Sequence, residues 1–65
     1  MFSLKRFRVL FAESGMSVKE FAERCGINAV AVSKILNHKT NPTLQTVGKL
    51  AKGLNVSAAE LLTDE

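Results

Sequence analysis

One stretch of the sequence, VKEFAERCGINAVAVSKI at residues 18–35, decides the fold. Apolar residues recur every three or four positions on both sides of Gly26, which predicts two short helices joined by a tight link. Gly26 can adopt the positive φ that such a turn needs, and Ala22 is small enough for two helices to cross closely. The pattern is typical of a helix-turn-helix motif, whose second helix can enter the major groove of DNA. The residues expected to hold this motif together are Phe21, Ala22, Cys25, Gly26, Ile27, Val32 and Ile35.

Helical periodicity extends to both ends of the chain, and no segment alternates long enough at the period of two that a strand requires. We therefore expect an all-α fold. Five short helices are expected. The first comprises residues 3–13 and the third residues 28–37. The second begins at Ser17 and ends at Gly26, the fourth begins at Thr43 and ends at Asn55, and a short fifth begins at Ser57. The inner face of the fourth helix is expected to carry Leu44, Val47, Leu50, Ala51 and Leu54.

The length and the cysteine content restrict the class of protein. A chain of 65 residues allows a single domain over residues 1–65 and excludes a barrel or a doubly wound sheet. No apolar run is long enough to span a membrane. The single cysteine, Cys25, excludes an intrachain disulfide, and no Cys/His cluster is present, so we expect neither a metal nor a cofactor. We expect Cys25 to be a core residue, and a reducing cytoplasm is the default compartment.

The charge is unevenly distributed along the chain. Residues 1–53 contain nine basic and three acidic residues, a net charge of +6, whereas residues 54–65 contain three acidic residues and no basic one. A basic body favours an anionic partner. Lys5, Arg6 and Arg8 are expected either to attract DNA at long range or to form a solvated helix face. The chain lacks a Ser/His/acid set and a glycine-rich phosphate loop, so we do not expect an enzyme.

Several segments resemble one known family. They are Gly-Met-Ser-Val-Lys-Glu-Phe-Ala at 15–22, Cys-Gly-Ile-Asn at 25–28, Val-Ser-Lys-Ile-Leu-Asn-His-Lys at 32–39, Asn-Pro-Thr-Leu at 41–44, Leu-Ala-Lys-Gly-Leu-Asn-Val-Ser at 50–57 and Glu-Leu-Leu at 60–62. Together they are similar to the phage repressor and Cro group, also called xenobiotic-response-element regulators. The resemblance implies a compact five-helix domain like that of lambda repressor, with its helix-turn-helix core at residues 17–37. It also implies sequence-specific binding to double-stranded DNA, usually as a homodimer on a palindromic operator.

The chain departs from the family pattern at three places. Val18 stands where many members have Gln at the start of the second helix, and Ala29 and Val30 replace the usual polar residues that open the recognition helix. His38 replaces the common Gly after that helix, so it must adopt a left-handed or bridging conformation. These departures reduce the number of side chains that can bind a base edge by hydrogen bonds.

The candidate DNA contacts fall into two groups. On the recognition helix at residues 28–37, Ser33 and Lys34 can reach base edges, whereas Ala29 and Val30 can offer only apolar contact to a thymine methyl group. The candidate phosphate contacts are Lys39, Asn37 and Thr40 in and before the loop that follows this helix, and Ser17 and Lys19 at the start of the second helix.

Two functions remain open from the sequence. The first is a transcriptional regulator that binds DNA in the cytoplasm at the nucleoid, expected to be a repressor from a phage, a mobile element or an antidote operon. The second is a protein-interaction module for a toxin or regulatory partner, which the apolar opening of the recognition helix favours. A DNA-binding domain cut from a longer regulator is less expected, because the chain begins with Met1 and ends with acidic residues.

Overall fold

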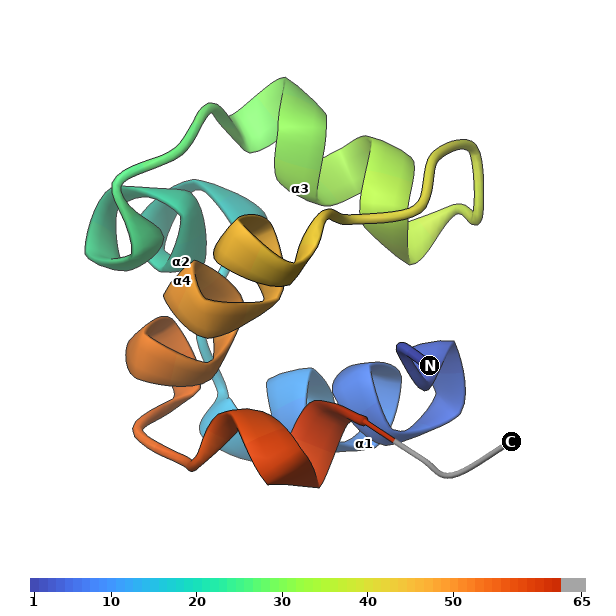
Figure 1. Cartoon of the computed structure of the whole chain (residues 1–65). Coiled ribbons are helices and arrows are strands. Elements are labelled where there is room, and N and C mark those ends of the chain that lie inside the picture. Colours follow the sequence, from blue (N-terminus) through green and yellow to red (C-terminus); the bar gives the residue numbers. More distant parts are fainter. Residues whose placement is uncertain (63–65) are drawn as a thin grey trace.

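The computed structural model describes residues 1–62 and is all-helical over that range (Figure 1). Four α-helices are followed by one turn of 3₁₀-helix: α1 (Leu4–Ser14), α2 (Val18–Cys25), α3 (Ala29–Leu36), α4 (Leu44–Leu54) and η1 (Ala58–Leu61). Four of the five expected helices are therefore α-helices, whereas the fifth segment is a 3₁₀ turn. The Ser57 side chain makes no capping hydrogen bond, and a four-residue element closes more readily with i→i+3 bonds. Asp64 and Glu65 lie outside the described residues.

The expected helix starts are confirmed by side-chain caps. Ser3, Ser17 and Thr43 accept hydrogen bonds from backbone amides three residues further on, at 3.1–3.3 Å. Asn28 Oδ1 accepts from the amide of Val30 at 2.6 Å. Each helix begins one residue after its cap, because the cap residue itself keeps an extended backbone.

The expected helix ends are confirmed by left-handed backbone conformations. Gly26 and Asn55, the expected ends of α2 and α4, have φ of 75° and 61°, and Gly15, which follows α1, has φ of 73°. His38 also has a positive φ, 58°, so the histidine takes over the geometry for which the family pattern uses glycine. The helix-turn-helix link is thus closed by Gly26, and the loop after α3 turns at His38.

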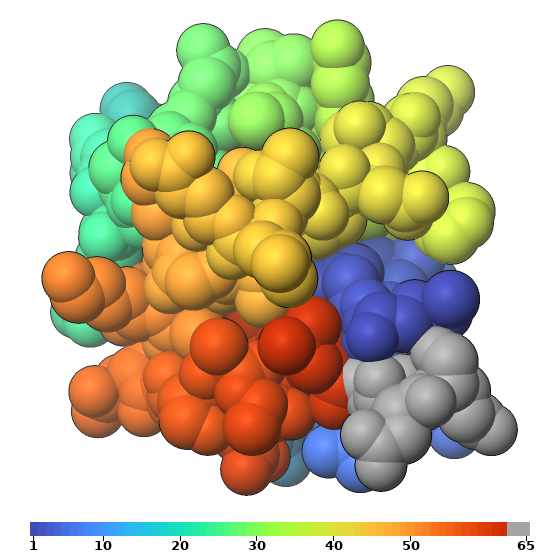
Figure 2. Space-filling model, viewed as in Figure 1, coloured from blue at the N-terminus to red at the C-terminus, as the bar shows by residue number. Residues whose placement is uncertain are grey.

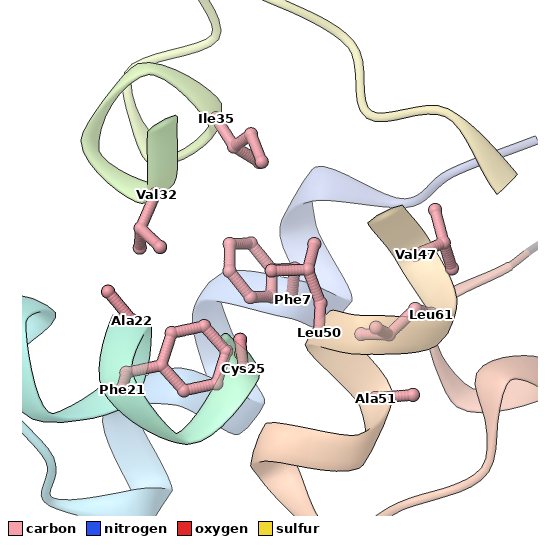
Figure 3. Packing of buried hydrophobic residues seen from close by; sticks show 10 residues of the cluster. All are labelled: Phe7, Phe21, Ala22, Cys25, Val32, Ile35, Val47, Leu50, Ala51 and Leu61. Atoms are coloured by element: carbon pink, nitrogen blue, oxygen red, sulfur yellow. The ribbon is translucent and has the colours of Figure 1, made fainter. Parts of the chain in front are cut away.

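A single cluster of ten buried side chains forms the core between the helices (Figure 3). Its members are Phe7, Phe21, Ala22, Cys25, Val32, Ile35, Val47, Leu50, Ala51 and Leu61. The Phe7 and Phe21 rings are both fully buried in it, with their centroids 5.8 Å apart. The half-buried Phe2 packs against this cluster, and its ring centroid lies 5.7 Å from that of Phe7. A β-bridge between Phe2 and Leu62 holds the N-terminal segment in this position.

The expectation that Leu44 lies on the inner face of α4 is wrong. Val47, Leu50 and Ala51 are buried as expected, whereas Leu44 is 79% exposed. Leu44 occupies the first position of α4, at the margin of the apolar stripe, so its side chain extends past the end of the core.

The elements stack so that α3 lies on one side of the molecule, and α1 and η1 lie on the opposite side, with α2 and α4 between them (Figure 1). In the space-filling view the N-terminal residues, in blue, lie between the loop that follows α3 and η1 (Figure 2). This arrangement leaves the outer face of α3 uncovered.

Candidate nucleic-acid interface

The recognition helix expected at residues 28–37 is α3, and it has one buried and one exposed side. Val32 and Ile35 are 0% and 3% exposed, and they attach α3 to the core. Val30 is 59% exposed, and Ser33 and Lys34 are exposed on the same outer side. Ala29 differs from the other three candidate base contacts, because it is half-buried and packs against the core. The face available to a ligand therefore centres on Val30, Ser33 and Lys34.

The helix-turn-helix residues hold α3 at this position. Phe21, Ala22 and Cys25 are buried on α2, and Ala22 lies next to Val32 of α3 in the core (Figure 3). Ile27, directly after Gly26, is half-buried, and its amide donates to the Ala22 carbonyl at 3.0 Å. The tight link and the small Ala22 side chain together allow α3 to pack against α2.

A second small residue, Gly53 of α4, lets α4 approach α2 and was missed by the sequence analysis. A Cβ atom on Gly53 would lie 2.4 Å from Cys25 Sγ and 3.0 Å from Phe21 Cε1. The sequence gives no direct signal for this contact, because a glycine inside a helix can also be an exposed one, such as Gly48 on the same helix.

A hollow on the surface joins the outer face of α3 to the following loop. It is lined by Asn28, Val30, Ala31, Lys34, Lys39 and Thr40. Lys34 and Lys39 thus come together although they belong to different elements, and no acidic residue of the described chain lines the hollow. The combination of an apolar side chain, a hydroxyl and two ammonium groups suits an anionic ligand with an apolar edge.

The loop after α3 is fixed by backbone hydrogen bonds to the last turn of the helix. The amides of His38 and Lys39 donate to the carbonyls of Ile35 and Lys34 at 3.1 Å and 2.8 Å. The Asn37 carboxamide folds back, and its Nδ2 donates to the Ser33 carbonyl at 2.9 Å. Of the three phosphate candidates in this region, Lys39 and Thr40 line the hollow, whereas the Asn37 carboxamide bonds to the last turn of α3.

The two phosphate candidates on α2 lie outside this hollow. Ser17 Oγ accepts from the Glu20 amide at 3.1 Å, so this hydroxyl serves as the cap of α2. Lys19 is exposed in the first turn of α2. The positive end of the α2 dipole and the Lys19 ammonium group both favour an anion at this end of the helix.

Arg8 has a specific contact that the sequence analysis did not predict. Its guanidinium donates from Nε and Nη2 to the carbonyl oxygen of Leu36, the last residue of α3. Arg8 is thus neither a merely solvated cation nor one available solely for long-range attraction. A backbone acceptor far along the chain leaves no pattern in the sequence, so this contact had no signal by which to be found.

The single thiol, Cys25, is free and buried in the core. Burial raises the pKa of the Cys25 thiol, and a backbone hydrogen bond from Gly53 opposes the shift only in part. Over residues 1–62, no three His, Cys, Asp or Glu side chains gather where they could hold a metal ion. None of the helices in the described range is long and apolar enough to cross a membrane.

Comparison with known protein families identifies the motif. A family model described as helix-turn-helix matches residues 4–61, which includes α1 to α4 and η1. No curated protein matches the chain. The matched family consists of DNA-binding regulators of transcription, and its members are of the Cro and phage-repressor type. The exposed face of α3, the Gly26 turn and the family match agree, and the chain belongs to the helix-turn-helix family of the Cro and phage-repressor type.

Proposed function

We propose that this protein is a sequence-specific transcriptional repressor that inserts α3 into the major groove of double-stranded DNA. The observation that carries the proposal is the hollow that joins Val30 and Lys34 of α3 to Lys39 and Thr40 of the loop. An α-helix fits the major groove of B-DNA, and phosphates lie at the rims of that groove. A helix placed there brings Lys39 next to the backbone while Lys34 faces the bases.

Base recognition in this proposal depends on few side chains. Lys34 can donate to the O6 and N7 acceptors of guanine, and Ser33 can donate to or accept from several bases. Val30, 59% exposed, matches the methyl group of thymine. Because Lys and Ser lack the planar fork of Arg or Gln, we expect DNA shape to supply much of the preference.

Phosphate contacts supply most of the affinity in this proposal. Lys39 and Thr40 contact the backbone on one side of the groove, and Ser17 and Lys19 contact it at the start of α2. With the Lys39 and Lys19 ammonium groups neutralising about two phosphates per protomer, the logarithm of the binding constant should fall with the logarithm of the salt concentration at a slope of about −1.8 per half-site.

The proposal includes a homodimer on a palindromic operator in the cytoplasm. Two copies of α3 would then enter successive major grooves about 34 Å apart. Occupation of an operator by this dimer would block access to an overlapping promoter, which is the proposed basis of repression.

Selection from a pool of random duplexes, followed by gel-shift titration, tests the proposal. Enrichment of one palindrome supports it. Lys34→Ala should then lose preference at one position of the site, whereas Lys49→Ala, a matched loss of an exposed α4 cation, should bind with unchanged preference. A pool in which no sequence is enriched contradicts the proposal.

A second candidate function is a protein-interaction module for a toxin or another regulator. The exposed Val30 side chain at the opening of α3 favours it, because large apolar side chains at a surface often mark a protein contact. Two results together would support this alternative. The selection finds no preferred duplex, and the Val30→Asp variant binds random duplexes as weakly, and with the same dependence on salt, as the wild type does.

A further inference from the structure

The carboxyl end of α3 is completed by a side chain from another helix. Arg8 of α1 donates to the Leu36 carbonyl from Nε at 3.0 Å and from Nη2 at 2.5 Å, across 28 residues of sequence. The other late carbonyls of α3 are used by the chain that follows. Those acceptors are Ser33, Lys34 and Ile35, bonded by residues 37, 39 and 38 respectively. Among these late carbonyls, that of Leu36 is bonded by a donor from another helix and not by the chain that follows α3.

A guanidinium group suits this acceptor for two physical reasons. The last carbonyls of a helix form the negative end of its dipole, where a cation is stabilised. Two N–H groups directed at one oxygen also restrict the orientation of the Leu36 peptide more than a single donor would. The contact thus fixes the direction in which the chain leaves α3.

The direction of the chain after Leu36 decides where the loop side chains lie. His38 turns the chain with a φ of 58°, a conformation that a histidine keeps only when its surroundings determine it. Lys39 follows directly, and its side chain lines the hollow together with Lys34 of α3. A shift of the Leu36 peptide would therefore move Lys39 relative to the face of α3.

We propose that Arg8 is a positioning residue for DNA binding: it holds the end of α3 so that Lys39 and Thr40 stay beside the face of α3. The DNA part of this inference rests on the proposed function. Arg8 acts through the Leu36 peptide and does not itself touch the phosphate backbone. A loss of Arg8 therefore weakens binding without removing a phosphate contact.

The test compares Arg8→Gln and Arg8→Lys with Arg6→Gln. Arg6 is the matched control, since it is an exposed cation on the same helix whose guanidinium makes no hydrogen bond within residues 1–62. Hydrogen exchange of the Lys39 amide, which bonds to the Lys34 carbonyl, reports on the loop without any DNA. The Leu50 amide in the core reports on global unfolding, and gel-shift titration of the selected duplex at several salt concentrations reports on binding.

We expect Arg8→Gln to speed exchange at Lys39 about fivefold beyond any change at Leu50, as the loss of a typical net hydrogen-bond contribution would. Binding should weaken about fivefold at every salt concentration, with an unchanged salt slope. Arg8→Lys, whose ammonium group keeps the charge and can donate to the Leu36 carbonyl through a single nitrogen, should recover part of both effects. Arg6→Gln should leave the exchange at Lys39 unchanged.

Two results overturn the inference. Exchange at Lys39 that is the same in Arg8→Gln and the wild type would show that Arg8 does not hold the loop. A salt slope reduced by about 0.9 in Arg8→Gln would show that Arg8 contacts a phosphate directly. A wild-type chain that selects no duplex overturns the proposed function instead, and the exchange experiment still decides whether Arg8 holds the loop.

Discussion

Replacing Gly53 by alanine tests the packing that places α2, and with it the helix-turn-helix motif. The added Cβ would lie 2.4 Å from Cys25 Sγ and 3.0 Å from Phe21 Cε1, so at least one of these buried side chains must move. Overpacking of this kind costs about 1–3 kcal/mol, whereas the alanine gains about 1 kcal/mol in helix propensity. We therefore expect a net loss of up to about 2 kcal/mol in the free energy of unfolding.

Gly48 provides the matched control on the same helix. It is exposed, and a Cβ added there meets no atom within 4 Å. Gly48→Ala should therefore stabilise the protein by about 1 kcal/mol, which for a domain of this size raises Tm by about 4–8 °C. Thermal unfolding followed by circular dichroism measures both variants.

A third variant identifies the clashing atom. Cys25→Ala removes Sγ, so its cost should be smaller in the Gly53→Ala background than in the wild type, with a coupling energy of about 0.5–3 kcal/mol. If Gly53→Ala melts as high as Gly48→Ala, the close approach of α2 and α4 at Gly53 is refuted.

Three further predictions concern the interface and the thiol. Lys39→Ala should weaken binding to all duplexes alike and reduce the salt slope by about 0.9 in a gel-shift titration; an unchanged slope would remove Lys39 from the phosphate contacts. Val30→Ala should relax the preference at one A·T position, and replacing that thymine by uracil should weaken the wild type more than the variant; an equal loss in both would show that Val30 does not face the base. Because the pKa of Cys25 is raised, the folded chain binds more protons than the unfolded chain at pH values above the ordinary pKa of 9.0. The free energy of unfolding, measured in urea, should therefore fall as the pH rises past 9. The Cys25→Ala variant should lose that part of the pH dependence.

Much of the fold could be predicted from local patterns. The caps at Ser17 and Asn28 and the turn at Gly26 depend on residues three or fewer positions away, and the structure has them where they were expected. A left-handed or bridging conformation of His38 was expected because His38 stands where the family that the chain resembles commonly has glycine, and its φ is positive. These features need no knowledge of tertiary packing.

The features that could not be predicted depend on contacts between distant segments. Leu44 fits the helical period of α4 but extends past the end of the core, and periodicity alone does not show where a core ends. The fifth segment is too short for its pattern to distinguish an α-helix from a 3₁₀ turn. Gly53 and Arg8 act through partners 28 residues away from each, Cys25 and the Leu36 carbonyl.

The candidate site was predictable in part for the same reason. Val30 and Lys34 share a helix face, so the helical period places them together, and Lys39 was assigned by its position in the loop. Ala29 lies at the margin of that face, where only the packing of α3 on α2 decides its exposure, and it is half-buried. Asn37 was expected as a phosphate contact, which stays a prediction, and the bond from its Nδ2 to the Ser33 carbonyl depends on how the side chain folds back onto the helix.

An NMR titration of the ¹⁵N-labelled protein with the duplex enriched by selection tests the central claim most directly. If α3 enters the major groove, the largest amide shift changes should occur on its outer face at Val30 and Ser33, in the loop at Lys39 and in the first turn of α2 at Lys19. The surface hollow at Val9 and Glu60, between α1 and η1, should change little. Large changes at Val9 and Glu60 with unchanged amides along α3 would contradict the account.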